Sequence, residues 1–437
     1  MSNIEKRRKK NKKIKKEFDK LTIRIFYGVL LFIGFMGLLI PIRPSKSELE
    51  KRTLTKFPKI TAESFMSGEF FSDVSTWYAD TFPFRETLLT ANAKVEHLYG
   101  VQTEELHGTA VAADEIPDAD AEIETKEEEE PAGPDATLHD QPEQAGTIYV
   151  VDNIGFELYG FSVDGANAYI NVVNSTAEQL KGVADVYDIL VPTSIAVNLD
   201  KENQEKIGSS NQGDAIDYVY GHLDKSVTSI PLLDILKKHN SEYLYFKTDH
   251  HWTADGAYYA YRELMKAKDM KAAPLTDYTK TEYGGFVGTF YTYSGQSEAL
   301  KNNPDTVVTY TPQVNDMTYI DREGVEQTGN VIADPTDYSE ENKYLAFIGG
   351  DEPYSKIENP NITDGSSCVV IKESYANACI PFLVNSYQTV HVVDYRYYGQ
   401  NLLQLVKDNG IKDVIYLNNT HALLESATAN MSRIISN

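Results

Sequence analysis

The chain has 437 residues, of which 24% are charged, and its 65 acidic residues against 41 basic ones give a formal net charge of −24. This charge excludes a nucleic-acid binder, because the neutralisation of phosphates needs clustered Lys and Arg. The length is enough for one large domain or two ordinary domains with cores of their own.

The first 24 residues are strongly basic, and a long apolar segment follows them. They contain 11 bases and 3 acids, a local charge of +8, whereas residues 25–42 contain no charged side chain. A helix of that length spans roughly 27 Å, close to the ~30 Å hydrocarbon core of a membrane. A cleaved signal peptide is the alternative, but the apolar run exceeds the usual ~7–15 residues and no small-x-small cleavage site follows. We predict a cytoplasmic tail over 1–24 and a single transmembrane helix over 25–42, with the main domain outside the cell membrane.

The next two segments differ sharply in composition. Residues 43–110 place apolar and aromatic side chains at spacings that suit short helices, which predicts an ordered stalk or subdomain. Within 111–146, the stretch from Asp114 to Glu143 has 13 acids, one base, four prolines and no aromatic residue. This composition cannot bury enough apolar surface to offset the entropy of ordering, so we expect a disordered linker or loop. Calcium binding is the sharper alternative, but the spacing of an EF-hand loop is absent.

Residues 147–437 alternate between strand and helix patterns. The clearest series runs through strand 367–371, helix 375–386, strand 389–393, helix 401–409 and strand 413–417. Other expected strands are 187–192, 243–246 and 344–348, and other expected helices are 171–181 and 254–268. Strands separated by one helix form right-handed parallel crossovers. We therefore predict an α/β domain with a doubly wound, mostly parallel sheet. The cysteines Cys368 and Cys379 are too few for a disulfide framework or a Cys-rich zinc site, and we expect free thiols.

Two stretches lie at expected strand ends, where open α/β sheets place their active sites. The first contains Asp249, His250 and His251, followed by Trp252 at the start of a helix. In the second, Ser374 lies between a buried strand and the next helix. A serine there has its backbone N–H at the positive end of a helix dipole and could be both nucleophile and oxyanion donor. An imidazole to take its proton and a carboxylate to orient the imidazole would complete a triad.

Each of these residues also has a purely structural interpretation. Ser374 and Asp249 could cap helices, and Trp252 could belong to the core or to the wall of a pocket. His250 and His251 could bind a metal, although adjacent side chains at a strand end diverge and no third cluster completes a site. Spacing alone leaves these alternatives open.

The chain resembles a known family in several stretches. Phe246-Lys-Thr-Asp-His-His-Trp-Thr253, followed by Gly256-Ala-Tyr-Tyr-Ala-Tyr261, is similar to the signature of the DHHW protein family. That family in turn resembles the SGNH-hydrolase-like O-acetylation proteins of the alginate type. Further similar stretches are 51–54, 80–85, 190–193, 347–350, 372–377, 381–383 and 394–398. Together they span most of residues 50–400, apart from the acidic segment.

The resemblance implies roles for individual residues. It maps the triad onto Ser374, His251 and Asp249, with no metal and no organic cofactor. The candidates for substrate binding are Trp252, His250, Arg396 and Tyr375. For Arg396, an ion pair with Asp394 or another acid is an equal alternative.

Two positions depart from the pattern of the family. Glu373 precedes the serine where such motifs carry Asp, and Asp351 stands where Asn is expected. An ionised aspartate cannot donate a hydrogen bond. This leaves the backbone N–H groups of Ser374 and of a nearby glycine as candidate oxyanion donors.

The implied function is that of a membrane-anchored, extracytoplasmic O-acetyltransferase or acetylesterase of a cell-surface polysaccharide. Transferase and esterase share one acetyl-enzyme and differ only in the acceptor. The acetyl donor would reach the site through a multi-pass membrane acyltransferase partner. One alternative is a non-catalytic glycan-binding or scaffold subunit of a polysaccharide modification or export complex, which Glu373 and Asp351 favour. Another is a metal-dependent hydrolase that uses His250 and His251.

Overall fold

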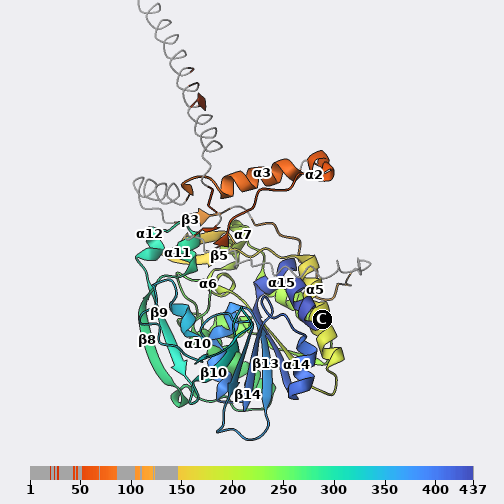
Figure 1. The fold of residues 1–437 in the computed structure, drawn as a ribbon. Coiled ribbons are helices and arrows are strands. Elements are labelled where there is room, and N and C mark those ends of the chain that lie inside the picture. The colour runs from red at the N-terminus through yellow and green to blue at the C-terminus, as the bar shows by residue number, and fades with distance from the viewer. Residues whose placement is uncertain are drawn as a thin grey trace, which may run out of the picture. The chain divides into compact units, whose positions relative to one another are not determined.

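A computed structural model of the chain describes residues 43–44, 46–47, 52–67, 69–85, 104–108, 111–121, 123 and 146–436, with four isolated residues before position 30 (Figure 1). The described residues up to Arg85 form one unit, and those from Glu104 onward form another. No helix among the described residues is both long and apolar enough to cross a membrane. The segment 25–42, predicted to do so, lies outside them except for Tyr27 and Gly28, so the membrane anchor stays a prediction.

The first unit has the short helices expected from its apolar spacing. Its elements are β1 (Lys46–Ser47), β2 (Arg52–Thr53), α2 (Ala62–Ser67) and α3 (Glu69–Asp80). The ring of Phe57 packs edge-on against Trp77 of α3, with centroids 4.8 Å apart. The Asp80 carboxylate accepts hydrogen bonds from the backbone N–H (2.7 Å) and the hydroxyl (2.8 Å) of Thr55. These contacts hold the segment before the helices against α3.

The second unit is built around an eight-stranded sheet. Its strands, in spatial order, are β11 (Glu326–Asn330), β10 (Asp316–Ile320), β12 (Tyr354–Glu358), β14 (Thr389–Asp394), β13 (Ser367–Lys372), β15 (Asp413–Asn419), β6 (Asp185–Val191) and β7 (Val227–Ser229). Strands β14 to β7 pair in parallel, whereas β11, β10, β12 and β14 pair antiparallel. The predicted mostly parallel sheet is therefore a mixed sheet with an antiparallel edge. The sequence hides this edge because β11 is polar and largely exposed and shows no apolar pattern.

Successive side chains of β13 enter two different cores, because a strand has a period of two. Cys368 and Val370 pack with α10 (Ala254–Ala267), α13 (Ile380–Val384) and the hairpin of β8 (Thr279–Phe286) and β9 (Asp305–Thr311). Val369 and Ile371 pack with α5 (Val163–Gln179), α14 (Leu402–Asn409) and α15 (Glu425–Ser436). Figure 1 shows α10 and the hairpin on one side of the sheet and α5, α14 and α15 on the other. Both faces of the sheet are thus covered, and both cysteines are buried free thiols.

The order of the strands places a switch point at β13. The chain passes from β13 to β14 on one side, and then crosses back to β15 on the other side. In an open α/β sheet, ligands bind outside the carboxyl ends of the strands at such a point. Lys372, the last residue of β13, lies beside Asp394 and Leu417 of the two neighbouring strands. The residues directly after Lys372 therefore emerge at the position favoured for a site.

The remaining elements surround this sheet. A small antiparallel sheet consists of β3 (Glu104–His107), β4 (Ile148–Val151) and β5 (Ile154–Glu157). The other helices are α6 (Ser194–Asn198), α7 (Lys201–Lys206), α8 (Gln212–His222), α9 (Leu233–Lys238), α11 (Thr289–Tyr293) and α12 (Glu298–Lys301). Short 3₁₀-helices are η2 (Leu275–Asp277), η3 (Lys343–Ala346), η4 (Ser374–Ala378) and η5 (Thr420–Leu423). Because β3 pairs with β4, the globular unit begins before the expected boundary at residue 147.

The start of the acidic segment, expected to be a disordered linker or a loop, is a loop with hydrogen bonds to the globular unit. The Asp114 backbone N–H donates to the Phe161 carbonyl (2.9 Å), and the Asp114 carboxylate accepts from the backbone N–H of Val163 (2.9 Å). His222 also contacts the Ala121 carbonyl through Nε2 (2.6 Å). Residues 111–121 are therefore a fixed loop, whereas residues 124–145 lie outside the described residues.

Two expected elements have a different form. The expected helix 375–386 is divided into η4 and α13, because Pro381 in the first turn of α13 has no N–H to continue an earlier helix. The expected strand 344–348 is the helix η3 followed by a single bridge between Phe347 and Ile332.

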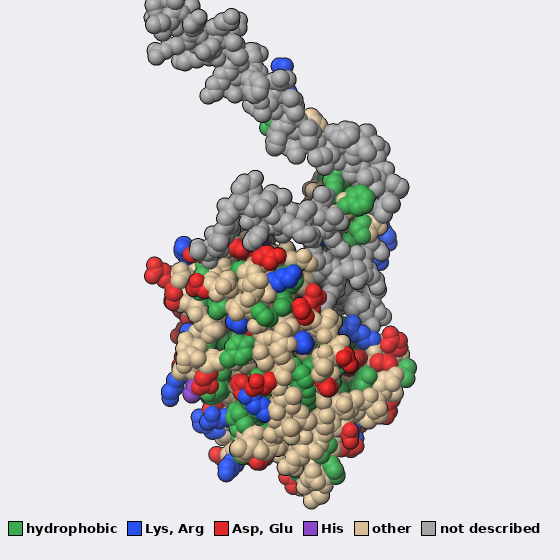
Figure 2. Space-filling view, turned by 90° about the vertical axis from the view of Figure 1, so that its left-hand side faces the viewer, with side chains coloured by type: hydrophobic (Ala, Val, Ile, Leu, Met, Phe, Trp, Pro, Cys, Tyr) green, Lys and Arg blue, Asp and Glu red, His purple; other side chains and the backbone are tan. Residues whose placement is uncertain are grey.

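On the face shown in Figure 2, acidic and basic side chains are interspersed over the described surface.

Candidate active site

The motif Asp249–Trp252 lies at the tip of a tight loop. Tyr245 and Trp252 form an isolated antiparallel bridge, and the Phe246 N–H donates to the His251 carbonyl (3.2 Å). The expected strand 243–246 is therefore one arm of this loop. Thr253 caps α10, because its hydroxyl oxygen accepts from the Gly256 N–H (3.2 Å). The bridge and the cap fix the loop at both ends.

A buried carboxylate that the sequence analysis missed supports the base of this loop. Asp305, 2% exposed, accepts from the N–H (2.8 Å) and the hydroxyl (2.6 Å) of Thr248 and from the N–H of Lys247 (3.0 Å). The Tyr243 hydroxyl also donates to it. Burial raises the pKa of Asp305 above its usual value, although these hydrogen bonds lower it. Its separation of 57 residues from Thr248 explains why no local pattern reveals it.

The turn that carries Ser374 is held by the side chain before it and by the end of β15. One oxygen of the Glu373 carboxylate accepts from the Tyr375 N–H (2.7 Å), and the other accepts from the Asn419 N–H (3.0 Å). The Glu373 N–H donates to Oδ1 of Asn418 (3.1 Å). Glu373, the first departure from the family pattern, is thus a structural link between the turn and β15.

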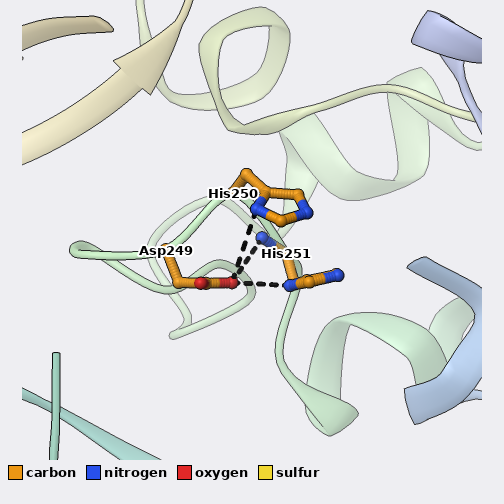
Figure 3. Close-up of side chains that lie close together, drawn as sticks. All are labelled: Asp249, His250 and His251. Atoms are coloured by element: carbon orange, nitrogen blue, oxygen red, sulfur yellow. Dashed lines mark hydrogen bonds and ion pairs between the residues drawn. The ribbon is translucent and has the colours of Figure 1, made fainter. Parts of the chain in front are cut away.

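The three residues expected to form the triad lie in a continuous hydrogen-bonded chain. His251 Nε2 is 2.8 Å from Ser374 Oγ, and His251 Nδ1 is 2.6 Å from Asp249 Oδ1. Figure 3 shows the Asp249 carboxylate facing both neighbouring imidazoles. Asp249 is 2% exposed, and both Ser374 and His251 are 5% exposed. The structure brings the three side chains together in the predicted order, and their catalytic roles remain predictions.

The ionisation state of Asp249 determines which ring nitrogen of His251 carries a proton. Burial alone would raise the pKa of its carboxyl, but His251, His250 and hydrogen bonds outweigh burial and hold the pKa well below its usual range. An ionised carboxylate only accepts hydrogen bonds, so His251 carries its proton on Nδ1 and donates it to Asp249. In the neutral form of His251 the lone pair of Nε2 then faces the hydroxyl of Ser374, as a general base requires.

Tyr344 of η3 contacts both His251 and Ser374, and no pattern in the sequence predicted this role. Its ring stacks on the His251 imidazole at a centroid distance of 3.7 Å and an angle of 12°. Its hydroxyl donates to the Ser374 carbonyl (3.0 Å). The His250 ring is also 3.7 Å from that of His251, and two rings at this distance cannot share one face. The imidazole of His251 is therefore held between Tyr344 and His250.

Two of the residues predicted to bind substrate are buried. Trp252 and Tyr375 are each 0% exposed, and the Trp252 Nε1–H donates to the Tyr375 carbonyl (2.7 Å). A direct substrate contact is therefore not available to either ring. Trp252 instead joins the motif loop to the turn after Ser374, in the core role considered above.

Arg396, the third of these residues, takes part in a buried charge network. Its guanidinium binds the Asp394 carboxylate (2.7 Å) and the Asp351 carboxylate (3.0 Å). Lys372 Nζ, 0% exposed, binds the same two carboxylates at 3.0 and 2.7 Å. The interpretation of Arg396 as an ion-pair partner is thus the one that the structure shows.

Asp351, the second departure from the family pattern, is part of this network. Burial would raise its pKa, but the charges of Lys372 and Arg396 outweigh burial and hold it well below its usual range. It accepts from the amide Nδ2 of Asn377 (3.0 Å), which also donates to the Gly350 carbonyl (3.4 Å). Neither side chain is therefore placed as an oxyanion donor. The Gly350 N–H donates to the Phe347 carbonyl (3.2 Å) and is therefore not available for this role.

The same loop tip contains the atoms that a metal would need. Ligand atoms of Asp249, His250 and His251 lie within 4.8 Å of one another. The Nδ1 atoms of His250 and His251 are each engaged, at 2.7 Å with Thr289 Oγ1 and at 2.6 Å with Asp249 Oδ1. A metal held by these atoms would have to displace both hydrogen bonds. The donor set therefore fits a hydrogen-bonded chain better than a metal site.

Comparison with known proteins gives this arrangement a family. The sequence model of the family described as DHHW protein matches residues 50–131 and 121–393, more than half of the chain. The chain belongs to the DHHW protein family. The four letters of the family name correspond in this DHHW protein to Asp249–Trp252, the tip of the loop described above. No curated protein sequence matches the chain significantly.

Two of the similar solved structures show the same fold. A DHHW family protein from Eubacterium siraeum is 30% identical, with a TM-score of 0.61, and the match covers 67% of this chain and 96% of that one. Bacillus cereus PatB1 with a sulfonyl adduct is 22% identical, with a TM-score of 0.55, over 64% of this chain and 97% of that one. The O-acetyltransferase domain of Pseudomonas putida AlgJ is 12% identical over 64% of this chain and 96% of that one, and its TM-score of 0.37 is too low for comparison of residues.

Proposed function

We propose that this DHHW protein is a serine-dependent O-acetyltransferase or acetylesterase of a cell-surface polysaccharide. The observation that carries the proposal is the chain from Ser374 Oγ through His251 to Asp249, with contacts of 2.8 and 2.6 Å. This arrangement suits acyl transfer, because a hydroxyl becomes a good nucleophile only when a positioned base removes its proton.

The proposed reaction has two halves. Ser374 Oγ attacks the acetyl carbonyl while His251 Nε2 takes the hydroxyl proton, and His251 then passes this proton to the departing oxygen of the donor. The acetyl group is now esterified to Ser374. In the second half a sugar hydroxyl or water attacks the ester, His251 takes its proton, and the proton returns to Ser374 Oγ. Asp249 remains ionised throughout and stabilises the imidazolium.

The oxyanion of each half would be stabilised by backbone N–H groups. Ser374 is the first residue of η4, directly after the residue that follows β13. Gly349 has φ +70°, a conformation that glycine adopts without strain, and its loop lies next to the Asn377 side chain that contacts Gly350. We assign the donor roles to the N–H groups of Ser374 and Gly349.

The polysaccharide substrate and the acetyl group are supported by the sequence resemblance to alginate-type O-acetylation proteins. The membrane anchor over 25–42, the extracellular position of the domain and the acyltransferase partner belong to the same proposal. An anchor of this kind would hold the site close to a donor that crosses the membrane.

The first test compares the turnover of a chromogenic acetyl ester by the parent protein and by Ser374→Ala. We expect the variant to lose at least about 1,000-fold in kcat/KM, because nucleophile and base act as one unit. Ser426→Ala, in an exposed position of α15, is the matched control and should retain full turnover. Equal turnover by the parent protein and Ser374→Ala would sink the serine mechanism.

Mass spectrometry, a glycan-binding assay and treatment with a chelator distinguish the proposal from the two alternatives. An acetyl group on the peptide that contains Ser374, absent from Ser374→Ala, supports the acetyl-enzyme. Glycan binding that survives Ser374→Ala, without any acetyl-enzyme, would instead indicate a non-catalytic subunit. Loss of turnover on treatment with a chelator would indicate the metal-dependent hydrolase.

A further inference from the structure

The second oxygen of the Asp249 carboxylate is held by a residue outside the triad. Oδ1 accepts from His251, whereas Oδ2 accepts from the backbone N–H (2.9 Å) and the hydroxyl (3.0 Å) of Thr289. Thr289 is the first residue of α11, 40 residues from Asp249. The carboxylate is thus fixed at both oxygens, and rotation about its last bond would break hydrogen bonds on both sides.

The hydroxyl of Thr289 is itself oriented by His250. Thr289 Oγ1 is 2.7 Å from His250 Nδ1. A threonine hydroxyl has one proton, and an ionised carboxylate can only accept, so this proton goes to Asp249 Oδ2. Thr289 Oγ1 must then accept the Nδ1–H of His250. The direction of the chain is therefore His250 to Thr289 to Asp249.

His250 is placed for this contact by burial and by stacking. Its side chain is only 12% exposed, and its ring lies 3.7 Å from that of His251, opposite Tyr344. A single residue thus contacts the imidazole of the base directly and orients the carboxylate of the triad through Thr289.

We propose that His250 and Thr289 are positioning residues that fix the Asp249 carboxylate in the orientation that holds His251 Nδ1–H. This inference rests on the proposed function for its effect on turnover. We call the hydrogen bonds from His250 through Thr289 to Asp249 the relay. The relay supports the orientation of His251, and it needs no contact between His250 and substrate. It gives the first histidine of the motif a role that the triad alone does not provide.

The test uses pairs of variants of the full chain that keep or remove one hydrogen bond. Thr289→Val has nearly the same shape but no hydroxyl, and Thr289→Ser keeps the hydroxyl. His250→Leu removes the donor, and His250→Asn offers an amide N–H at the position of Nδ1. Loss of a hydrogen bond to a charged group changes a rate by about 10- to 100-fold. We expect Thr289→Val and His250→Leu to lower kcat by this factor with KM within about twofold. Thr289→Ser and His250→Asn should retain most of the parent kcat.

A spectroscopic measurement makes the relay testable without turnover. The far-downfield proton resonance of the His251 Nδ1–H, assigned by its absence in His251→Ala, reports the hydrogen bond to Asp249 directly. We expect it in the parent protein and in Thr289→Ser, and we expect it shifted or broadened in Thr289→Val. His239→Leu, which removes a hydrogen bond between His239 and Glu242 outside the site, is the control and should change neither measurement.

Two outcomes would overturn the relay. One is an unchanged resonance and unchanged kcat in Thr289→Val, and the other is an equal loss in Thr289→Val and Thr289→Ser. If the parent protein has no Ser374-dependent turnover but the resonance responds as expected, the relay stands and the proposed function fails.

Discussion

The Asp188 carboxyl of β6 shows what burial does to a single group outside the triad. Its Oδ1 accepts from the Tyr169 hydroxyl (2.5 Å), and its Oδ2 is buried without a hydrogen-bond partner among the described residues. Burial raises the pKa of this carboxyl to about 7, although the hydrogen bond from Tyr169 lowers it. The native state therefore binds a proton that the unfolded chain releases near pH 4.

This shift predicts that stability falls as the pH rises. Between about pH 4 and pH 7 the native state holds more protons at Asp188 than the unfolded state, so the free energy of unfolding decreases with pH. Asp188→Asn keeps the shape without the charge, and at pH 8 it should raise the free energy of unfolding by up to about 4 kcal/mol. Urea unfolding at pH 5 and pH 8 measures this, with Asp185→Asn, exposed on the same strand, as the control. An identical pH dependence in Asp188→Asn and the parent protein would contradict the assignment.

Residues of the site differ in how far the sequence reveals them. The chemistry and expected positions of Asp249, His251 and Ser374 made them candidates, and the resemblance to the family selected them as a triad. Tyr344, Thr289 and Asp305 could not be predicted, because their roles depend on contacts with segments distant in the sequence. Trp252 was placed at the correct site, but the sequence could not show that its ring faces the core.

At the scale of elements, the turn between β8 and α11 approaches the motif loop so closely that it requires glycine. The Gly288 N–H donates to the Thr248 hydroxyl oxygen (3.0 Å), and the Phe290 N–H donates to the Thr248 carbonyl (2.9 Å). A Cβ atom at Gly288 would lie 2.3 Å from both Cβ and Oδ2 of Asp249. A larger residue at position 288 could therefore be accommodated only if the Asp249 side chain or the turn itself moved.

Gly288→Ala should consequently impair the reaction more than the fold. A displacement of about 1 Å in a catalytic group can cost about 100-fold, and we expect a loss of this size in kcat/KM. Gly284→Ala, in the same hairpin, meets no atom closer than 3.9 Å and is the matched control. Steady-state turnover of the acetyl ester and thermal unfolding of both variants would check this. Full turnover by Gly288→Ala would show that the carboxylate need not stay in place.

Elements with strong apolar patterns were predicted well, and polar or interrupted elements were not. Strands β13, β14 and β15 and helices α10 and α14 lie within a few residues of their expected positions. The antiparallel edge escaped prediction because β11 is polar, and one expected helix was interrupted by Pro381. The local apolar pattern thus identifies the central parallel crossovers, but it does not reveal the β10–β11 pair that extends the sheet.

Over the whole molecule, the buried charge network joins the loop before β12 to the ends of the parallel strands β13 and β14. Lys372 is 0% exposed and contacts Asp351 and Asp394, so its removal would leave the two carboxylates to share the guanidinium of Arg396. Breaking a buried ion pair from one side costs about 3–5 kcal/mol, because a charge stays buried without compensation. The network thus couples the antiparallel and parallel parts of the sheet.

Lys372→Met should therefore lower the free energy of unfolding by about 3–5 kcal/mol. The double variant Lys372→Met/Asp394→Asn removes one charge of each sign and should recover part of this loss. Lys266→Met, at a lysine side chain that is 76% exposed and paired with Glu263, is the control and should change stability by less than about 1 kcal/mol. Urea unfolding measures all three, and a loss below about 1 kcal/mol in Lys372→Met would contradict the coupling.

The attachment of the Ser374 turn to β15 also concerns the order in which the protein is made. Glu373 is tied to Asn418 and Asn419, which are translated 45 and 46 residues later. A polypeptide that leaves the ribosome before these residues therefore contains the whole motif loop and the nucleophile but lacks the support that β15 gives to the nucleophile turn. Prematurely terminated chains should be chemically inert even where their remaining strands fold. Completion of synthesis is in this sense a precondition for reactivity.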